Sequence, residues 1–368
     1  MSPKEVKYKI ASFIRKSRIG FIVEKIRIKY VDYLTSALEI ILSATVGFLI
    51  VAVLLYFMGY DPYEVFSILF RYGYGNTSYL LSKSVPYVMS AMAFSIPLLA
   101  GVFNIGGESQ LYVGAFTSLL VTYYTANPVL GLLAGLLAGG GLGLFISILR
   151  VYRNINEVIA AIMINWTMYF LLVYLITGTY YDPRMPHQSI QVPKSAWLGE
   201  FISPWGRIKV SFILAIIGAC VIYYILYYTN IGYLLRVSGL SPLSARYAGY
   251  NPRKAILYSM LLGGAMAGLG GALFIIGDVH SIDTTMSTLY GLGFTGIGIG
   301  LLGRNHPIGI IFAAIFFSGL LIGGQWVELK TGAPPQLTDT IIGIIVIALA
   351  IPYAYRMLIS MVRRWRIK

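Results

Sequence analysis

Long apolar runs recur along the whole sequence and constrain its fold more than any other feature. A helix that crosses a lipid bilayer needs roughly 17–25 predominantly apolar residues. Runs of this kind occur at residues 37–58, 84–102, 109–126, 128–149, 157–178, 209–229, 254–276, 290–303, 307–324 and 338–359. The run at 290–303 is short and rich in glycine, so we expect either a half-helix or different boundaries there. The predicted fold class is all-α, a polytopic integral membrane protein with about ten transmembrane helices.

Composition and charge agree with a protein embedded in a membrane. Hydrophobic residues make up 57% of the chain and charged residues 11%, whereas soluble domains have about 45–50% and about 25%. The net charge of +14 could indicate nucleic-acid binding. However, Lys and Arg residues that are held near the cytoplasmic ends of the spans explain most of this charge. We therefore expect the lipid bilayer, and no nucleic acid, to be a partner.

Basic residues predict the orientation of the spans. With the N-terminus inside, alternate connections carry Arg150, Arg153, Arg236, Arg246, Arg253, Lys254 and Arg304. Both termini are then cytoplasmic, in the plasma (inner) membrane, and the outside holds residues 59–83, 179–208, 277–289 and 325–337. We divide the chain into a basic cytoplasmic segment at 1–36, a transmembrane domain at 37–359 and a basic cytoplasmic tail at 360–368. We expect no cleavable signal peptide, because the start is basic and amphipathic.

Motifs of enzymes and metal sites are absent from the sequence. The three histidines, His187, His280 and His306, lie far apart, and no His-Glu-x-x-His motif or phosphate-binding G-x-x-x-x-G-K-[ST] motif occurs. Cys220 is the only cysteine, which excludes an intramolecular disulfide and a thiolate metal site. We expect a non-catalytic protein with no catalytic residue, no metal and no cofactor.

The stretch GVFNIGGESQLYVGAF, residues 101–116, places polar groups inside an apolar region. Ionisable groups and irregular backbone are tolerated at membrane depth only where they are buried in protein or line a water-filled path. We therefore expect a break between two spans at 103–110. Asn104, Glu108 and Gln110 either face a substrate pathway or hold the bend near the cytoplasmic boundary, and we favour the second use.

Two further regions contain candidate pathway elements. Asn165, Trp166 and Tyr169 lie on nearby turns of one span and offer amide and aromatic groups to a sugar or base, although core packing is the alternative. The stretch GFTGIGIGLLGRNHPIG predicts a second interrupted helix pair. Two broken elements in corresponding halves would resemble the inverted repeats of transporters, but the internal similarity is too weak to establish a repeat.

The connection at 236–255 is longer than a reversal of the chain requires. Ser241 and Pro242 predict a helix start, residues 243–248 a short helix, and Gly249 its left-handed end. Such a cytoplasmic helix, with Arg246 and Tyr247 exposed, suits docking to a partner protein. The alternative is an interfacial helix that rests on lipid headgroups.

Glycine and proline patterns predict how the helices pack and begin. Small residues recur every four positions at Gly131, Gly135, Gly139 and Gly143, and again at Gly264, Gly268 and Ala272, which lets helix backbones approach closely. Helix starts are predicted where a proline follows Asn127, Ser203, Ser241, Asn251 or His306.

Four stretches in order resemble a known family. Four stretches, FNIGGESQLYVGAF, INEVIAAIMINW, GLSPLSARYAGYNPRKA and GFTGIGIGLLGRNHPIGI, resemble the permease subunits of ATP-binding-cassette (ABC) importers for simple sugars and nucleosides. The resemblance covers roughly residues 85–325. Ser109 stands where many relatives have glycine, and the loop at 179–208 resembles nothing that we can place.

The resemblance implies a function and several partners. The chain would be the permease subunit that carries a nucleoside or a simple sugar, such as the pentoses xylose, arabinose or ribose, through the membrane. A separate ATPase subunit, an extracytoplasmic solute-binding protein and a second permease subunit would be its partners. The region 236–255 would be the coupling loop that contacts the ATPase, with Ser241, Ser244, Arg246, Tyr247 and Gly249. The alternative is an ion-coupled secondary transporter of a small polar solute.

Overall fold

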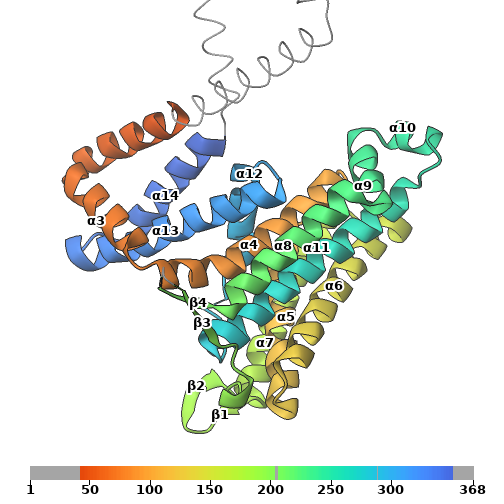
Figure 1. Cartoon of the computed structure of the whole chain (residues 1–368), viewed down its shortest axis with the longest axis horizontal. Coiled ribbons are helices and arrows are strands. Elements are labelled where there is room, and N and C mark those ends of the chain that lie inside the picture. Colours follow the sequence, from red (N-terminus) through yellow and green to blue (C-terminus); the bar gives the residue numbers. More distant parts are fainter. Residues whose placement is uncertain (1–41, 204–205, 288, 351–368) are drawn as a thin grey trace, which may run out of the picture. The chain divides into compact units, whose positions relative to one another are not determined.

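The computed structural model describes residues 42–203, 206–287 and 289–350 (Figure 1). The predicted cytoplasmic segments 1–36 and 360–368, the start of the first span and the end of the last span lie outside the described residues. The chain divides into two compact units, one of residues Met1–Tyr60 with Ile347–Lys368 and one of residues Asp61–Val346. Helix Leu42–Phe57 lies in the first unit. All sites discussed below lie in the second unit.

Helices dominate the described residues, and each expected span coincides with one of them. The labelled helices are α3 (Pro62–Gly75), α4 (Thr77–Leu99), α5 (Gly107–Thr125), α6 (Pro128–Arg153), α7 (Glu157–Gly178), α8 (Val210–Tyr228), α9 (Asn230–Leu240), α10 (Pro242–Tyr247), α11 (Pro252–Phe274), α12 (Leu292–Leu302), α13 (Pro307–Thr331) and α14 (Pro335–Ala350). A π-helical turn, η2 (Ile275–Val279), extends α11. Helices α6, α7, α8, α11 with η2, and α13 are long and apolar enough to cross a membrane. The predicted class, an all-α polytopic membrane protein, is confirmed.

The expected start of the second span at residue 84 is wrong, because α4 begins at Thr77, and residues 59–83 contain α3 and the first turns of α4. Asn76 caps α4, since its Oδ1 accepts a hydrogen bond from the N–H of Tyr79 at 3.1 Å. The polar residues Ser82, Lys83 and Ser84 interrupt the apolar run at the point where the span was expected to begin. Ser82 and Ser84 are nevertheless buried inside the helix, so polar sequence here marks protein contacts and not a helix boundary.

Helix α12 is the half-helix expected near 290–303, with 11 residues. It turns sharply into α13 through Arg304 and Asn305, both with positive φ, 54° and 53°. Asn305 accepts a hydrogen bond from Ser95 Oγ of α4 at 3.0 Å, which ties the turn to the bundle. The predicted second interrupted pair is therefore present.

Glycines bring α6 and α11 into close contact, as their spacing predicts. A Cβ atom added at Gly139 would lie 2.6 Å from the Cα of Gly268, and one added at Gly143 would overlap the carbonyl oxygen of Met260. Gly135 also lies beside Gly114 of α5. Because the two helices pack antiparallel in this register, the end of α6 lies beside the start of α11.

Two β-hairpins lie between α7 and α8, at the end of the second unit opposite α10 (Figure 1). Strand β1 (Tyr181–Asp182) pairs with β2 (Met185–Ser189), and β3 (Glu200–Ser203) pairs with β4 (Gly206–Lys209), with a short 3-10 helix, η1 (Lys194–Ala196), between them. The predicted helix start at Ser203 is wrong, because Ser203 pairs with Gly206 in the second hairpin and α8 begins at Val210.

Candidate functional site

A break separates α4 from α5 where the sequence predicts one. Helix α4 ends at Leu99, Gly101 adopts a φ of +76°, and α5 begins at Gly107. Gly106 is tightly surrounded, since an added Cβ atom would lie 2.7 Å from Ile146 Cδ1 of α6. The irregular backbone is thus buried in protein, the condition that a membrane interior imposes.

Asn104 and Gln110 hold the break together from inside. Asn104 Nδ2 donates to the carbonyl oxygen of Ala93 at 3.0 Å and to Gln110 Oε1 at 3.1 Å. Asn104 Oδ1 accepts from the N–H of Gly106 at 3.0 Å. Both side chains are buried. These bonds satisfy polar groups of the bend, and neither side chain lines the pocket described below.

Asn165 ties α7 to the same break. Its Oδ1 accepts from the N–H of Ser109 at 3.1 Å, and its Nδ2 donates to the carbonyl oxygen of Ile105 at 3.1 Å. Ser109, which departs from the family pattern, donates its hydroxyl to the carbonyl oxygen of Gly106 at 3.0 Å. The departure therefore adds a hydrogen bond that a glycine could not make.

Glu108 connects the start of α5 to the start of α12. Its carboxylate accepts from the N–H of Gly291 at 2.5 Å and of Phe294 at 2.9 Å, and from the hydroxyl of Tyr112. Glu108 is 1% exposed. An acidic group is favoured at a helix N-terminus, and Glu108 occupies two such positions at once. This arrangement stabilises a carboxylate that would be costly in an apolar interior.

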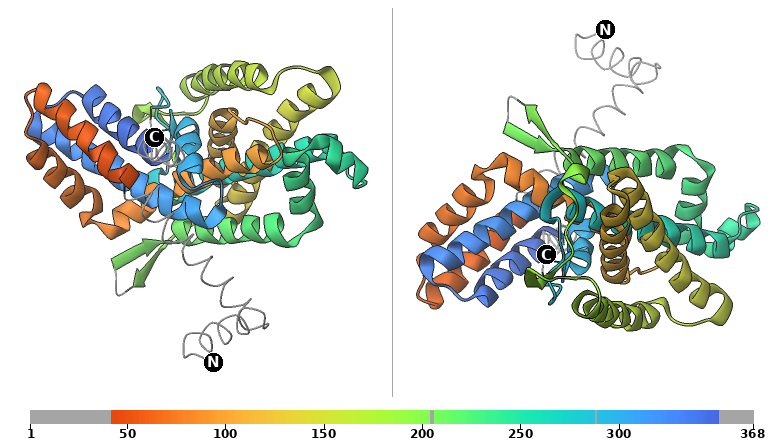
Figure 2. Two further views of the ribbon diagram at one scale, coloured as in Figure 1. Left: turned by 90° about the horizontal axis from the view of Figure 1, so that it is seen from above. Right: turned by 90° about the horizontal axis from the view of Figure 1, so that it is seen from below.

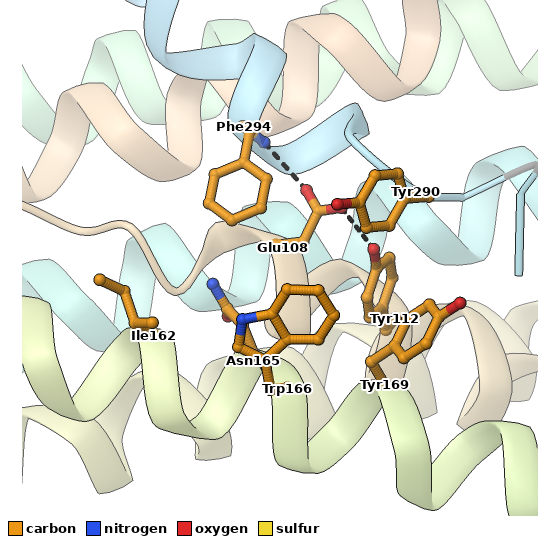
Figure 3. A pocket seen from close by; sticks show the side chains of 8 residues that line it. All are labelled: Glu108, Tyr112, Ile162, Asn165, Trp166, Tyr169, Tyr290 and Phe294. Carbon is orange, nitrogen blue, oxygen red and sulfur yellow. Dashed lines mark hydrogen bonds between the residues drawn. The ribbon is translucent and has the colours of Figure 1, made fainter.

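A small pocket lies beside Glu108 (Figure 3). Figure 3 shows aromatic side chains around the carboxylate of Glu108. The pocket is lined by Glu108, Tyr112, Ile162, Asn165, Trp166, Tyr169, Tyr290 and Phe294. The ring of Tyr169 lies 5.8 Å from that of Trp166 and 6.1 Å from that of Tyr290. Four of the six predicted pathway residues thus meet here, Glu108, Asn165, Trp166 and Tyr169.

Four pocket residues, Tyr112, Ile162, Tyr290 and Phe294, were missed by the sequence reasoning. Tyr112 lies one helical turn after Glu108, so spacing along α5 could have identified it. Tyr290 and Phe294 flank the start of α12, and no local signal links them to Glu108. Among the described residues, no group of three or more His, Cys, Asp or Glu side chains could hold a metal ion.

The short helix α10 forms as the sequence predicts. Ser241 Oγ accepts from the N–H of Ser244 at 3.2 Å, and Gly249 ends the turn with a φ of +81°. Ala245 is buried, whereas Arg246 is exposed and Tyr247 is 87% exposed. Helix α10 therefore presents a cationic and an aromatic side chain at one end of the second unit (Figure 1).

Comparisons with known proteins identify relatives of this chain. A family model described as "Branched-chain amino acid transport system / permease component" matches residues 76–350. The guanosine ABC transporter permease protein NupP of Bacillus subtilis (strain 168) is 31% identical over 343 residues, which cover 90% of this chain and 97% of that protein.

Two further relatives carry different substrate names. The nucleoside ABC transporter permease protein NupB of Lactococcus lactis subsp. cremoris is 27% identical over 330 residues, 85% of this chain and 90% of that protein. The glucose ABC transporter permease protein of Haloferax volcanii is 29% identical over 339 residues, 87% of each chain. No solved structure matches this chain at a significant level.

Proposed function

This chain belongs to the family of branched-chain amino acid transport system permease components, and we propose that it is the permease subunit of an ATP-driven importer for nucleosides. The pocket beside Glu108 is the observation that carries this proposal, because it combines aromatic faces with polar groups. Aromatic rings stack on a flat base, and the carboxylate attracts ribose hydroxyls. Two relatives are named for guanosine or nucleosides.

The depth of the pocket supports a place on the substrate pathway. Helix α12 runs from the pocket to Arg304, and its 11 residues span roughly 16 Å. The apolar core of a bilayer is about 30 Å thick. With Arg304 at the cytoplasmic surface, Glu108 lies near the middle of the membrane, deeper than the cytoplasmic boundary that the sequence suggested.

A second permease subunit completes the pathway in our proposal. Figure 2 shows α7 along the margin of the second unit, and on this helix Met163, Trp166 and Phe170 are 66%, 50% and 63% exposed. A pathway that opened to lipid along α7 would hold a polar solute against hydrocarbon, which is unfavourable. A related or identical subunit against α7 shields the pocket and forms the other half of the pathway.

The ATPase subunit docks on α10 in this proposal, through Ser241, Ser244, Arg246, Tyr247 and Gly249. The solute-binding protein delivers substrate at the opposite end, near the hairpins β1–β2 and β3–β4. The exposure of Tyr247 supports the docking role, since exposed aromatic residues are enriched where proteins bind one another. We expect Tyr247→Ala to reduce co-purification of the ATPase at least tenfold. The matched variant Tyr63→Ala, which truncates a tyrosine with 82% exposure on α3, should leave co-purification unchanged.

Uptake into vesicles tests the function directly. The complete importer, with its ATPase and solute-binding protein, is reconstituted, and uptake of guanosine, uridine, ribose and glucose is measured with and without ATP. We expect ATP-dependent uptake of nucleosides and at least tenfold slower uptake after Trp166→Ala. Uptake of glucose alone would replace the nucleoside assignment by a sugar assignment. Uptake driven by an ion gradient without ATP would contradict an ABC importer.

A further inference from the structure

A second cavity adjoins the pocket beside Glu108, and Tyr290 lines both. This cavity, which we call the outer cavity, measures about 280 Å³ and is bounded by α4, α11, α13 and the segment before α12. Its lining includes Tyr79, Lys83, Tyr87, Ser287, Tyr290 and Gln325. We propose that the outer cavity is a second binding site for the transported nucleoside, in which Lys83 recognises acceptor atoms of the base. The inference rests on the proposed function and adds a specificity-determining residue to it.

The positive charge of Lys83 in the outer cavity is only partly neutralised, because Asp278 is shared with Lys209. The Nζ of Lys83 lies 4.0 Å from Oδ2 of Asp278. Lys209 Nζ already contacts Asp278 Oδ1 directly, and Ser82 Oγ donates to the same oxygen at 2.9 Å. One carboxylate thus serves two ammonium groups, and Lys209 holds the closer position. The positive charge of Lys83 remains available to a ligand.

Aromatic rings fix the position of the Lys83 ammonium group. Its Nζ lies 5.5 Å from the ring centres of both Tyr79 and Phe274, within the range of cation–π attraction. The side chain is 33% exposed, so the ammonium group is reachable from the cavity. A cationic ligand is repelled here, whereas a neutral ligand with a carbonyl oxygen or an unprotonated ring nitrogen accepts a hydrogen bond from it.

The remaining lining suits a nucleoside. Tyr79, Tyr87 and Tyr290 provide faces for a flat heterocycle. Gln325 forms no side-chain hydrogen bond with the described residues, so its amide is available to sugar hydroxyls. The volume is close to the lower end of the range of roughly 300–1,000 Å³ that is typical of small-molecule sites. An acyl chain of a lipid would leave Lys83 and Gln325 without partners, which disfavours it as the occupant.

Cysteine labelling tests whether the outer cavity binds a nucleoside. In a Cys220→Ser background, Lys83→Cys or Gln325→Cys is introduced, and the complete importer is placed in vesicles of phosphatidylcholine. We expect a membrane-impermeant thiol reagent added on the side of the solute-binding protein to label both cysteines. Guanosine at millimolar concentration should slow labelling at least fivefold, and glucose should not. Failure of labelling, or labelling that guanosine does not slow, would overturn the proposal.

The same experiment also tests whether a lipid occupies the outer cavity. If phosphatidylglycerol in the vesicles blocks labelling and guanosine adds nothing, an anionic headgroup occupies the cavity and the proposal is wrong. Guanosine uptake by the unmodified importer separates the two proposals. Where ATP-driven uptake is present but protection is absent, only the outer cavity fails, whereas absence of nucleoside uptake contradicts the proposed function itself.

Transport kinetics test the role of Lys83. We expect Lys83→Met to raise the KM for guanosine about tenfold, the loss of one charge-assisted hydrogen bond, and Lys83→Arg to restore most of it. Lys330→Met removes an exposed lysine from the end of α13, outside both cavities, and should leave KM unchanged. Equal KM values for Lys83→Met and Lys330→Met would exclude recognition by Lys83.

Discussion

Glu108 fixes the relation of two helices that lie far apart in the sequence. Its carboxylate receives backbone hydrogen bonds from the start of α12, 183 and 186 residues away. Gly293 leaves the space for this contact, because an added Cβ atom would lie 2.5 Å from the Cα of Glu108. One side chain therefore holds the half-helix in place and also lines the pocket. Its contact with substrate stays a prediction.

Replacing this carboxylate should loosen α12. Glu108→Gln keeps the size of the side chain but loses the charge. Its amide N–H₂ group would also face the hydrogen-bond donors that now bind the carboxylate, which are the backbone N–H groups of α12 and the hydroxyl of Tyr112. Hydrogen bonds to a charged group contribute roughly 1.5–3 kcal/mol each, so we expect the free energy of unfolding to fall by about 2 kcal/mol or more. Thermal unfolding in detergent measures this. Glu64→Gln removes an exposed carboxylate from the first turn of α3 and serves as control; equal stability of both variants would contradict the linking role.

His280 should make stability depend on pH. It stacks on Trp197 with 3.8 Å between ring centres, and burial, followed by the charge of Lys209, lowers the pKa of His280 below its usual value. As pH falls from 7 to 5, the unfolded chain binds a proton here before the folded protein does, so stability decreases.

The comparison of two histidine variants isolates this effect. We expect the melting temperature to fall less between pH 7 and pH 5 in His280→Phe, which keeps a ring against Trp197, than in the unchanged protein. His187→Phe, at an exposed position of β2, should behave like the unchanged protein. An unaltered pH profile in His280→Phe would refute the contribution of this group.

At the scale of elements, backbone contact decides how the helices pack. Helices α5, α6 and α11 meet through glycines whose hydrogen atoms face the neighbouring backbone. In a bilayer, such close packing replaces the hydrophobic driving force, which is weak between helices surrounded by lipid. Asn127 and Asn251, each before a proline, cap α6 and α11 through their side-chain oxygens, and these caps set where the packed helices begin.

One helix offers a matched pair of substitutions. Gly139→Ala would force a methyl group against Gly264 and Gly268 of α11, whereas Gly141→Ala places one in open space on the same helix. Overpacking costs typically 1–3 kcal/mol, so we expect about that loss for Gly139→Ala and little change for Gly141→Ala. Chemical or thermal unfolding in detergent distinguishes them; equal effects would show that α6 and α11 do not touch here.

At the scale of the whole molecule, the second unit has basic connections at one end and the β-hairpins at the other. The antiparallel register of α6 and α11 places Arg150 and Arg153 at the same end as residues 236–254. The hairpins lie at the other end (Figure 1). The chain is a multi-pass membrane permease, and this distribution agrees with basic residues on the cytoplasmic side. The orientation itself stays a prediction.

Labelling in intact cells determines the orientation. In a Cys220→Ser background, we expect an impermeant thiol reagent to modify Phe201→Cys, in the exposed part of β3, and to leave Tyr247→Cys unmodified. Permeabilised cells that lack the ATPase subunit should show both modified. Modification of Tyr247→Cys in intact cells would place α10 outside and exclude its docking to an ATPase.

Local features could be predicted from the sequence because they depend on neighbouring residues. The apolar runs predicted where the long apolar helices lie along the chain, and Ser241, Pro242 and Gly249 predicted the short helix α10. The break at Asn104 could also be predicted, because polar groups are costly in a span that faces lipid and the neighbouring glycines permit a bend. Even the grouping of Trp166 with Tyr169 follows from their spacing on one helix.

Contacts between distant segments were decided only by the tertiary structure. No local pattern pairs Glu108 with the start of α12, and the polar run at Ser82–Ser84 resembles the end of a span until Asp278 is seen beside it. The physical reason is that the environment of a polar side chain depends on what the folded bundle places around it. Sequence alone determines which segments prefer lipid, whereas the packing of the whole chain determines where a charge can be buried and what it binds.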